Sequence, residues 1–261
     1  MNNLTRCIVD DKNGCIKKVY YKPDIWDLEF RTTIEARNLA LQRGNFYVPI
    51  ILDSDSSNLS ITFEYIPNLI PIISLLTDPS NRKLLFKIMI QVGETLSVIH
   101  SNLTVPGSIK PIPINIPCKS KEAFLHGDYN LMNIQLDVMR NRLVVLDWSF
   151  TPIVYPPGNR GPIFWDISWM LNSIFSSQPL LKNDFSFRSQ LAKKLLRSYS
   201  DSSMIKLDYF DLSNYCKQLF LIFMKKAKER KGIKYLVGLP NRYGLYRFAN
   251  MIAKKGWQIG E

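Results

Sequence analysis

The spacing of hydrophobic and polar residues changes near residue 67. Up to that point, polar and apolar positions alternate in short runs bounded by turn residues, which is typical of strands that bury one face. The predicted strands cover Leu4–Asp10, Cys15–Tyr21, Val48–Leu52 and Leu59–Tyr65. Asn13-Gly14 indicates a hairpin turn between the first two. A loop over Pro23–Asp27 leads to a helix predicted from Leu28 to Arg43, which ends at Gly44.

Beyond residue 67 the apolar residues recur at helical spacing. Helices are predicted over Pro79–His100, from Phe164 onward, from Phe185 to about Phe223, and over Tyr243–Lys255. We assign Tyr243, Tyr246 and Trp257 to the core. The proline-rich stretch Val105–Lys121 is predicted not to be helical. The chain therefore reads as an α+β protein with a small β-rich part carrying one helix, residues 1–66, and a larger, mainly helical part, residues 67–261.

Candidate chemistry is concentrated in Phe124–Phe150, FLHGDYNLMNIQLDVMRNRLVVLDWSF. His126-Gly127-Asp128 follows a short apolar run, and Asn133 comes five residues after Asp128. Alternating residues then predict a strand over Ile134–Val138, a turn and a second strand that delivers Asp147 at its end. This arrangement predicts that three polar side chains meet around one point.

The three side chains are of the type that phosphoryl transfer requires. That reaction needs a carboxylate beside the attacking hydroxyl and oxygen ligands for one or two Mg²⁺ ions. Mg²⁺ keeps several waters, so two protein ligands and the nucleotide phosphates suffice. Asp128 is the candidate catalytic residue that orients the hydroxyl or accepts its proton. Asn133 and Asp147 are the candidate metal ligands.

The motif HGDYNLMN followed by LDW resembles the catalytic loop and metal-binding aspartate of the aminoglycoside phosphotransferase and choline kinase group. Protein kinases usually have H-R-D and D-F-G at these places, so Gly127 and Trp148 favour the small-molecule branch. The resemblance implies a bilobal, protein-kinase-like fold with ATP and Mg²⁺ as cofactors. It also implies that His126 and Asp166 support the catalytic loop, Asp166 from the start of the following helix.

In such a fold a strand lysine faces the nucleotide phosphates. Lys17 and Lys18 both lie on the predicted strand Cys15–Tyr21, and alternate strand residues share a face. We favour Lys18, because Ile16 then lies on the same face as an apolar contact near the adenine. Glu35, in the middle of the predicted helix, is the expected ion-pair partner of this lysine, with Glu29 as the alternative.

The segment Phe63–Pro67 resembles the hinge between the two lobes, where backbone groups hold adenine. The resemblance implies that Glu64 and Ile66 use their backbone groups in this way, and that the N-terminal lobe covers residues 1–66 and the C-terminal lobe residues 67–261. The sequence departs from the pattern at its start, because Met1–Asn3 contains no glycine. We therefore expect either that the glycine-rich loop covering the phosphates is reduced to a few residues or that the nucleotide is held differently.

Composition limits the partners and the compartment. The net charge is +12, from 34 Lys and Arg against 22 Asp and Glu, which favours anionic partners. The basic run Lys225–Lys231 has no RNA-binding signature beside it, so nucleic acid is not favoured. The 4 cysteines lack metal-ligand spacing, and we expect free thiols. With no secretory signal and no apolar run long enough to span a membrane, we expect a cytoplasmic protein.

The leading hypothesis is an ATP- and Mg²⁺-dependent phosphotransferase acting on a hydroxyl of a small, neutral or anionic molecule. One alternative is an atypical protein kinase or ATPase, because YYKPDIWDLEFRTTIEARNL is loosely similar to the small lobe of the KEOPS-complex kinase. Another is a pseudokinase-like binding scaffold, which the missing glycine loop suggests. Asp128, Asn133 and Asp147 together argue against the scaffold, and a protein partner stays open.

Overall fold

The computed structural model describes residues 5–10, 12–107, 109–148, 157–176, 184–203, 205–231 and 239–254. Its strands are β1 (Thr5–Asp10), β2 (Cys15–Tyr20), β3 (Ile51–Asp55), β4 (Ser60–Glu64), β5 (Ile70–Pro71), β6 (Glu122–Phe124), β7 (Ile134–Asp137), β8 (Arg142–Val145) and β9 (Arg160–Pro162). Its helices are α1 (Pro23–Arg43), α2 (Ile72–Leu75), the 3-10 helix η1 (Pro79–Asn81), α3 (Arg82–Asn102), α4 (Phe164–Ser176), α5 (Phe185–Ser202), α6 (Tyr209–Lys231) and α7 (Leu239–Ile252).

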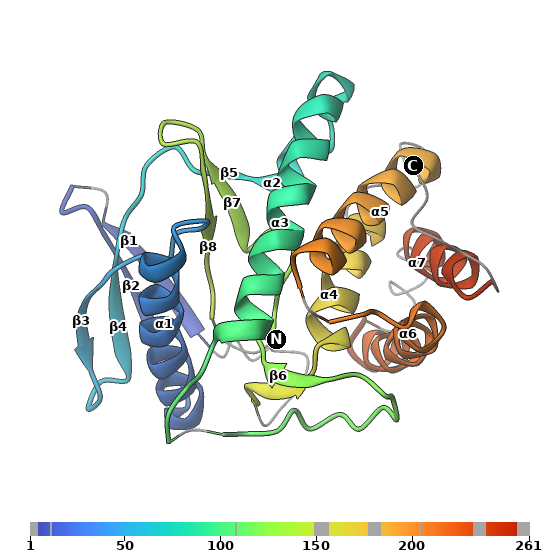
Figure 1. Ribbon diagram of the computed structural model, residues 1–261. Helices are drawn as coiled ribbons and strands as arrows, with labels where there is room; N and C mark the ends of the chain where they lie inside the picture. The colour runs from blue at the N-terminus through green and yellow to red at the C-terminus, as the bar shows by residue number, and fades with distance from the viewer. Residues whose placement is uncertain are drawn as a thin grey trace.

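The N-terminal part is an antiparallel sheet of order β1-β2-β4-β3, with α1 beside it (Figure 1). A small core of Tyr20, Ile25 and Ile61 joins the sheet to the helix, and Trp26 and Phe30 pack against it. Other residues of the same helix, Leu28, Ala36, Leu39 and Ala40, contribute to a much larger core that fills the C-terminal part. Helix α1 therefore connects the two parts of the molecule.

Helix α1 begins at Pro23, so the predicted loop over Pro23–Asp27 is wrong. Lys22 is extended at the N-cap, and Pro23 and Asp24 occupy the first turn. Proline fits there because its fixed φ suits a helix. It also lacks an N–H group, and an N–H in the first turn would have no hydrogen-bond partner within the helix. The end is as predicted, because Gly44 adopts φ 70° and its N–H caps the carbonyl of Ala40.

Only the end of the segment Val48–Leu52, which was predicted as a strand, belongs to the N-terminal sheet. Only from Ile51 does it pair with β4. Before that, Tyr47 donates to the Leu143 carbonyl (2.8 Å) and accepts from the Val145 N–H (2.9 Å), which places it beside β8. This bridge ties the N-terminal part to the sheet β5-β7-β8 that carries Asp147 at its end.

The C-terminal part is mainly helical, with α3 packed along α5 and α4 in contact with α5, α6 and α7 (Figure 1). The predicted helix over Pro79–His100 forms, with η1 as its first turn and α3 continuing to Asn102. In Val105–Lys121, the described residues form neither helix nor strand, and Pro111 makes an isolated bridge to Arg160. No described helix is both long and apolar enough to cross a membrane.

The prediction that Tyr243 and Tyr246 lie in the core is wrong. Their exposed fractions are 62% and 37%, and their rings stack on each other. The buried face of α7 is formed instead by Leu245, Phe248 and Ile252, among others. Trp257 lies outside the described residues. The four cysteines are free, as predicted: β1 and β2 pair Cys7 with Lys18 and Cys15 with Asp10, so these two thiols do not face each other.

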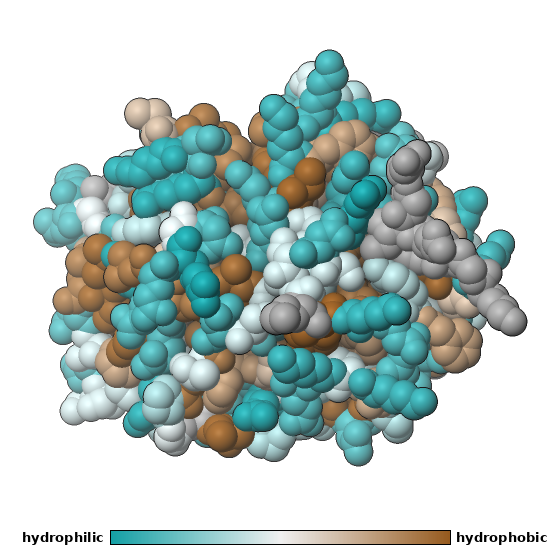
Figure 2. Space-filling view, viewed as in Figure 1, coloured by the Kyte–Doolittle hydropathy of each residue, from teal (hydrophilic) through white to brown (hydrophobic). Residues whose placement is uncertain are grey.

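Most of the surface in one view is hydrophilic, and hydrophobic side chains gather at the left, over the N-terminal sheet and α1 (Figure 2). Exposed hydrophobic residues of these elements include Ile34, Leu41 and Leu52. The hydrophobic residues of the C-terminal part are instead mostly in its core.

Gly93 permits the closest contact between α3 and α5. A Cβ atom at this position would lie 2.5 Å from the Leu195 carbonyl oxygen and 2.9 Å from the Tyr199 backbone nitrogen. Gly93→Ala is therefore expected to push the helices apart and to lower the free energy of unfolding by about 1–3 kcal/mol, measured by urea denaturation.

Gly244→Ala, in α7, is the matched control. The three atoms nearest to its Cβ would be side-chain atoms of Phe175, the closest at 3.2 Å. Alanine also has the better helix propensity, by about 1 kcal/mol, so this variant should be as stable as the wild type or more stable. Equal stability of Gly93→Ala and the wild type would contradict the close crossing of the backbones.

Candidate active site

The loop between β6 and β7 brings Asp128 and Asn133 together. The Asn133 amide nitrogen donates to the Asp128 carbonyl at 3.0 Å and to its carboxylate at 3.1 Å. Asn130 fixes the turn, because its amide donates to the Asp128 carbonyl and its own oxygen accepts from the Met132 N–H. Burial raises the pKa of Asp128 to about 7, against the lowering effect of hydrogen bonds from Asn130 and Asn133. The carboxyl is thus poised to exchange a proton near neutral pH.

Asp147 follows β8 and turns its carboxylate toward the N-terminal sheet. Its φ of 55° lies in the left-handed region, which aspartate tolerates better than most residues. Oδ1 lies 2.6 Å from Lys18 Nζ, while 49% of the side chain is exposed. The Lys18 ammonium holds the pKa of Asp147 below its usual range. Asp147 is therefore an ionised, accessible carboxylate.

Lys18 is held by two carboxylates from distant parts of the chain. Its Nζ lies 2.8 Å from both oxygens of Glu29 as well as 2.6 Å from Asp147, and only 7% of its side chain is exposed. Burial by itself lowers the pKa of Lys18, but the charges of Glu29 and Asp147 outweigh it and raise the pKa. The ammonium is therefore fully charged although it is buried.

The register of β2 distinguishes the two candidate lysines. Lys18 points toward α1 and Asp147, whereas Lys17 is exposed on the opposite face of the sheet. Ile16 shares the face of Lys18, since alternate strand residues do. Of the two lysines, only Lys18 reaches the candidate metal ligand.

The prediction that Glu35 forms an ion pair with Lys18 is wrong. Glu29 is the partner of Lys18 in the structure. Because α1 begins at Pro23, Glu29 lies in its second turn, beside β2, and is 2% exposed. Glu35 is six residues further on, about 9 Å along the axis and on a different face of the helix. Its side chain is only partly buried.

His126 connects the backbones that carry the two aspartates. Nδ1 accepts from the Asp128 N–H (3.3 Å), so we assign the proton to Nε2, which donates to the Leu146 carbonyl (2.9 Å). Burial lowers the pKa of His126, which favours this neutral form. The ring also lies 4.6 Å from Trp148, centroid to centroid. One imidazole thus links Asp128 to the residue before Asp147.

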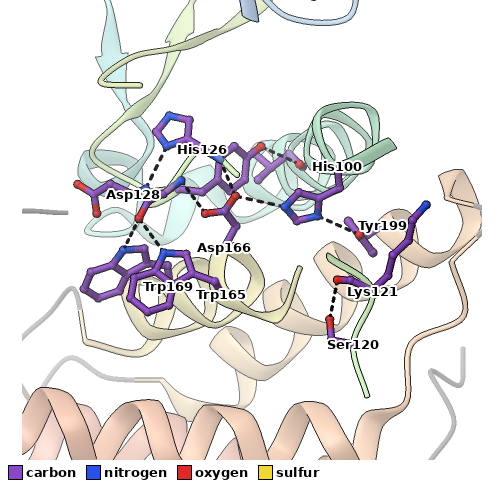
Figure 3. Close-up of polar contacts among 12 residues, drawn as sticks. His100, Ser120, Lys121, His126, Asp128, Trp165, Asp166, Trp169 and Tyr199 are labelled. Atoms are coloured by element: carbon purple, nitrogen blue, oxygen red, sulfur yellow. Dashed lines mark hydrogen bonds and ion pairs between the residues drawn. The ribbon is translucent and has the colours of Figure 1, made fainter. Parts of the chain in front are cut away.

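Asp166 holds the same loop from the start of α4 (Figure 3). Its oxygens accept the N–H groups of His126 (2.8 Å) and Gly127 (2.9 Å). His100 Nε2 lies 3.2 Å from Asp166 Oδ2, and Nδ1 lies 3.0 Å from the Tyr199 hydroxyl. The sequence predicted this role for Asp166 and assigned none to His100. The geometry places it in this buried chain.

Trp165 and Trp169 contact the loop as well, and sequence reasoning missed them. Both indole nitrogens donate to the Gly127 carbonyl, at 2.8 and 3.1 Å. Their spacing of four residues on a helix placed them on one face, which was the available signal.

Glu64, in the predicted hinge, is bound to the residues just before β3. The Glu64 N–H donates to the Ile50 carbonyl (2.9 Å), and its carboxylate accepts from the Tyr47 hydroxyl and the Ile50 N–H. Ile66 is 8% exposed, and its N–H makes no hydrogen bond within the described residues. Of the two candidate residues Glu64 and Ile66, only Ile66 therefore has a backbone N–H without a partner among the described residues.

The donor set suits Mg²⁺. Asp147 and Asn133 offer a carboxylate and an amide oxygen, the hard ligands that this ion prefers. Among the described residues, no group of three or more His, Cys, Asp or Glu side chains could hold a metal ion without other ligands. A metal here would complete its coordination with water and phosphate oxygens, as Mg²⁺ commonly does.

Comparison with known proteins addresses the fold. No protein-family model matches the sequence, and no curated protein does. Among solved structures, a choline/ethanolamine kinase family protein from Mesorhizobium loti aligns with 98% of this chain and 87% of its own, at TM-score 0.60 and 12% identity. A glucosamine kinase in complex with glucosamine, ADP and inorganic phosphate aligns with 95% of this chain and 80% of its own, at TM-score 0.65 and 12% identity.

Choline kinase LicA from Streptococcus pneumoniae aligns with 96% of this chain and 91% of its own, at TM-score 0.57 and 18% identity. The chain has the bilobal, protein-kinase-like fold. The α+β architecture expected from the sequence is thereby confirmed, with a small sheet-and-helix lobe and a larger helical lobe. At these identities the likeness shows the kinase-like fold, and the roles of the site residues stay predictions.

Within the small lobe, the Lys18–Glu29 ion pair can be tested by a matched pair of variants. Glu29→Ala removes one of the two carboxylates that contact the buried Lys18 ammonium and leaves Asp147. This variant is expected to lower the free energy of unfolding by about 3 kcal/mol. Glu35→Ala, on the same helix, should change it by less than about 0.5 kcal/mol. Chemical denaturation at neutral pH measures both, and equal losses would refute the assignment of Glu29.

Proposed function

We propose that the protein is a Mg²⁺- and ATP-dependent phosphotransferase that moves the γ-phosphate to a hydroxyl of a small molecule. The observation that carries this proposal is the contact of Lys18 with Asp147, 129 residues apart in the sequence. It brings the candidate phosphate ligand within 2.6 Å of the candidate metal ligand, where the two lobes meet. The likeness to small-molecule kinases, one of them bound to ADP, supports the proposal.

Lys18, oriented by Glu29, binds the nucleotide phosphates in this proposal. Ile16 lies beside the adenine, and backbone groups of Glu64 and Ile66 hold its edge. Lys17 faces away from this site and has no part in it. ATP thus lies between the sheet of the small lobe and the loop that carries Asp128.

Asp128 orients the acceptor hydroxyl and takes its proton as the oxygen attacks the γ-phosphorus. The bond between that phosphorus and the bridging oxygen of ADP breaks, and ADP leaves with the electron pair. Asn133 and Asp147 hold Mg²⁺, which supplies positive charge that offsets the charge on the phosphates. A carboxyl with a pKa near 7 can accept a proton at neutral pH more effectively than an ordinary, more acidic one.

The pairing of β9 argues against an extended peptide acceptor that would add to this strand. One edge of β9 pairs with β6, and the other is taken by the proline-rich segment, since Ile112 N–H donates to the Arg160 carbonyl (2.9 Å). Gly158 lets that segment approach, because a Cβ there would lie 2.5 Å from the Pro111 carbonyl oxygen. With both edges paired, β9 offers no place for a peptide to add as a further strand.

Asp128→Asn separates catalysis from binding. The amide keeps the size of the side chain but cannot accept a proton, so the rate of phosphate transfer should fall about 10²- to 10⁴-fold. The KM for ATP should stay within about threefold, because the change leaves the Lys18–Glu29 pair and Asp147 in place. Transfer from γ-³²P-ATP to a panel of small alcohols measures the rate, and ³¹P NMR identifies the phosphate ester.

Asp53→Asn is the control, since Asp53 is an exposed carboxylate on β3. It should transfer phosphate at the rate of the wild type. A wild type that labels no hydroxyl in the panel would overturn the proposed function, as would an Asp128→Asn variant of undiminished rate.

The charge of the chain predicts the kind of acceptor. A net charge of +12 repels polycations, so we expect neutral or anionic alcohols to be phosphorylated in preference to kanamycin. Relative kcat/KM values at low and high salt test this, because salt screens the repulsion. Efficient phosphorylation of kanamycin at micromolar concentration would refute the charge argument and leave the phosphotransferase assignment intact.

A further inference from the structure

Two tryptophans of α4 converge on one carbonyl oxygen of the catalytic loop. Trp165 Nε1 donates to the Gly127 carbonyl at 2.8 Å and Trp169 Nε1 at 3.1 Å (Figure 3). Their rings meet edge to face, with centroids 6.2 Å apart. Trp165 is fully buried and Trp169 is 7% exposed. We call these two side chains the indole clamp.

The clamped carbonyl belongs to the peptide whose nitrogen is that of Asp128. Gly127 has φ 88°, a conformation that glycine adopts readily because it has no Cβ. The same freedom means that sterics do not fix how this peptide is turned. Hydrogen bonds on both sides of Gly127 do so: Asp166 accepts the N–H of the preceding peptide at 2.9 Å, and the clamp holds the carbonyl of this one.

A carbonyl oxygen has two lone pairs, and the clamp provides a donor for each. Rotation of the peptide would leave two indole N–H groups without this partner in a buried site, which is costly. The rotation would also displace the Asp128 N–H from His126 Nδ1, at 3.3 Å. The clamp therefore opposes every turn of the peptide that redirects the Asp128 side chain.

We propose that Trp165 and Trp169 are positioning residues that fix the direction of the Asp128 carboxylate by saturating the Gly127 carbonyl. This inference rests on the proposed function, because it takes Asp128 to be the residue that meets the acceptor hydroxyl. Helix α4 would then fix the loop in two ways: Asp166 accepts its N–H groups, and the clamp donates to its carbonyl.

Trp26 provides a comparison within the same chain. Its indole N–H donates to the Ser60 carbonyl at 3.2 Å, in the small lobe. Any partly buried tryptophan tends to find such a partner, and losing it affects stability. What distinguishes the clamp is that two indoles share one carbonyl next to Asp128. Loss of the clamp should therefore reduce turnover, whereas the same loss at Trp26 should not.

The experiment replaces the indole N–H without changing the shape of the ring. Benzothienyl-alanine, which carries sulfur in place of N–H, is introduced at 165, at 169, at both, and at 26 as the control. The phosphate acceptor is the alcohol that the wild type uses fastest. The double replacement should lower kcat about 100-fold, the effect of a misplacement of about 1 Å, with the KM for ATP within about twofold. The replacement at 26 should leave kcat unchanged.

Hydrogen exchange of the backbone amides in 125–133 gives a readout independent of turnover. The double replacement should speed exchange in this segment about tenfold relative to 59–66, since the loop is then less constrained. Trp165→Phe and Trp169→Phe serve as single variants if the double replacement does not fold.

Failure of the proposed function can be distinguished from failure of the clamp proposal. A wild type without phosphotransferase activity refutes the proposed function, and the clamp is then judged by exchange alone. An active wild type whose clamp variants keep kcat within about twofold refutes the clamp. Unchanged exchange in 125–133 refutes it in either case.

Discussion

The buried ammonium of Lys18 is the constraint on which the rest of the structure depends. A charged group is stable in such a place only when opposite charges surround it, and here Glu29 and Asp147 do so at 2.8 and 2.6 Å. They reach it from α1 and from the second residue after β8, so one cation joins the small sheet, the helix α1 and the end of β8 in the large lobe. The three groups together carry one negative charge. If the proposed function holds, a cation bound to Asp147 would remove this excess charge and leave Lys18 available for the nucleotide phosphates.

Asp128 depends on a second set of contacts, which come from the large lobe. Asp166 holds the loop by two N–H groups, Trp165 and Trp169 hold it by a carbonyl, and His126 joins it to Leu146. Except for the His126 contact, these come from the first two turns of α4, a helix that is buried almost throughout. A rigid helix thus sets the position of a partly exposed carboxylate, which is how a functional group can be accessible and still precisely held.

Local patterns predicted the parts of the site that local geometry determines. The spacing of Asp128, Asn133 and Asp147 follows from one loop and one hairpin, and strand alternation was sufficient to favour Lys18 over Lys17. Glu29 was only the alternative, because the choice depended on where α1 begins, and Pro23 was read as part of a loop rather than as its first residue. The spacing of Trp165 and Trp169 indicates a shared helix face, but their common partner, the Gly127 carbonyl, could not be predicted, because it reaches them only when α4 packs against the loop. Tyr243 and Tyr246 were misplaced for a related reason: an amphipathic pattern does not say which aromatics face the neighbouring helices.

Nucleotide binding measured by thermal unfolding, with and without Mg²⁺, tests the central claim most directly. At 100 times its dissociation constant, a ligand that binds only the folded state stabilises it by about 2.7 kcal/mol, which is readily measured. The account predicts that ATP and Mg²⁺ together raise the Tm of the wild type more than either alone. In Asp147→Ala, Mg²⁺ should add nothing to the effect of ATP. The absence of any shift at millimolar ATP, or an equal Mg²⁺-dependent shift in both proteins, would contradict it.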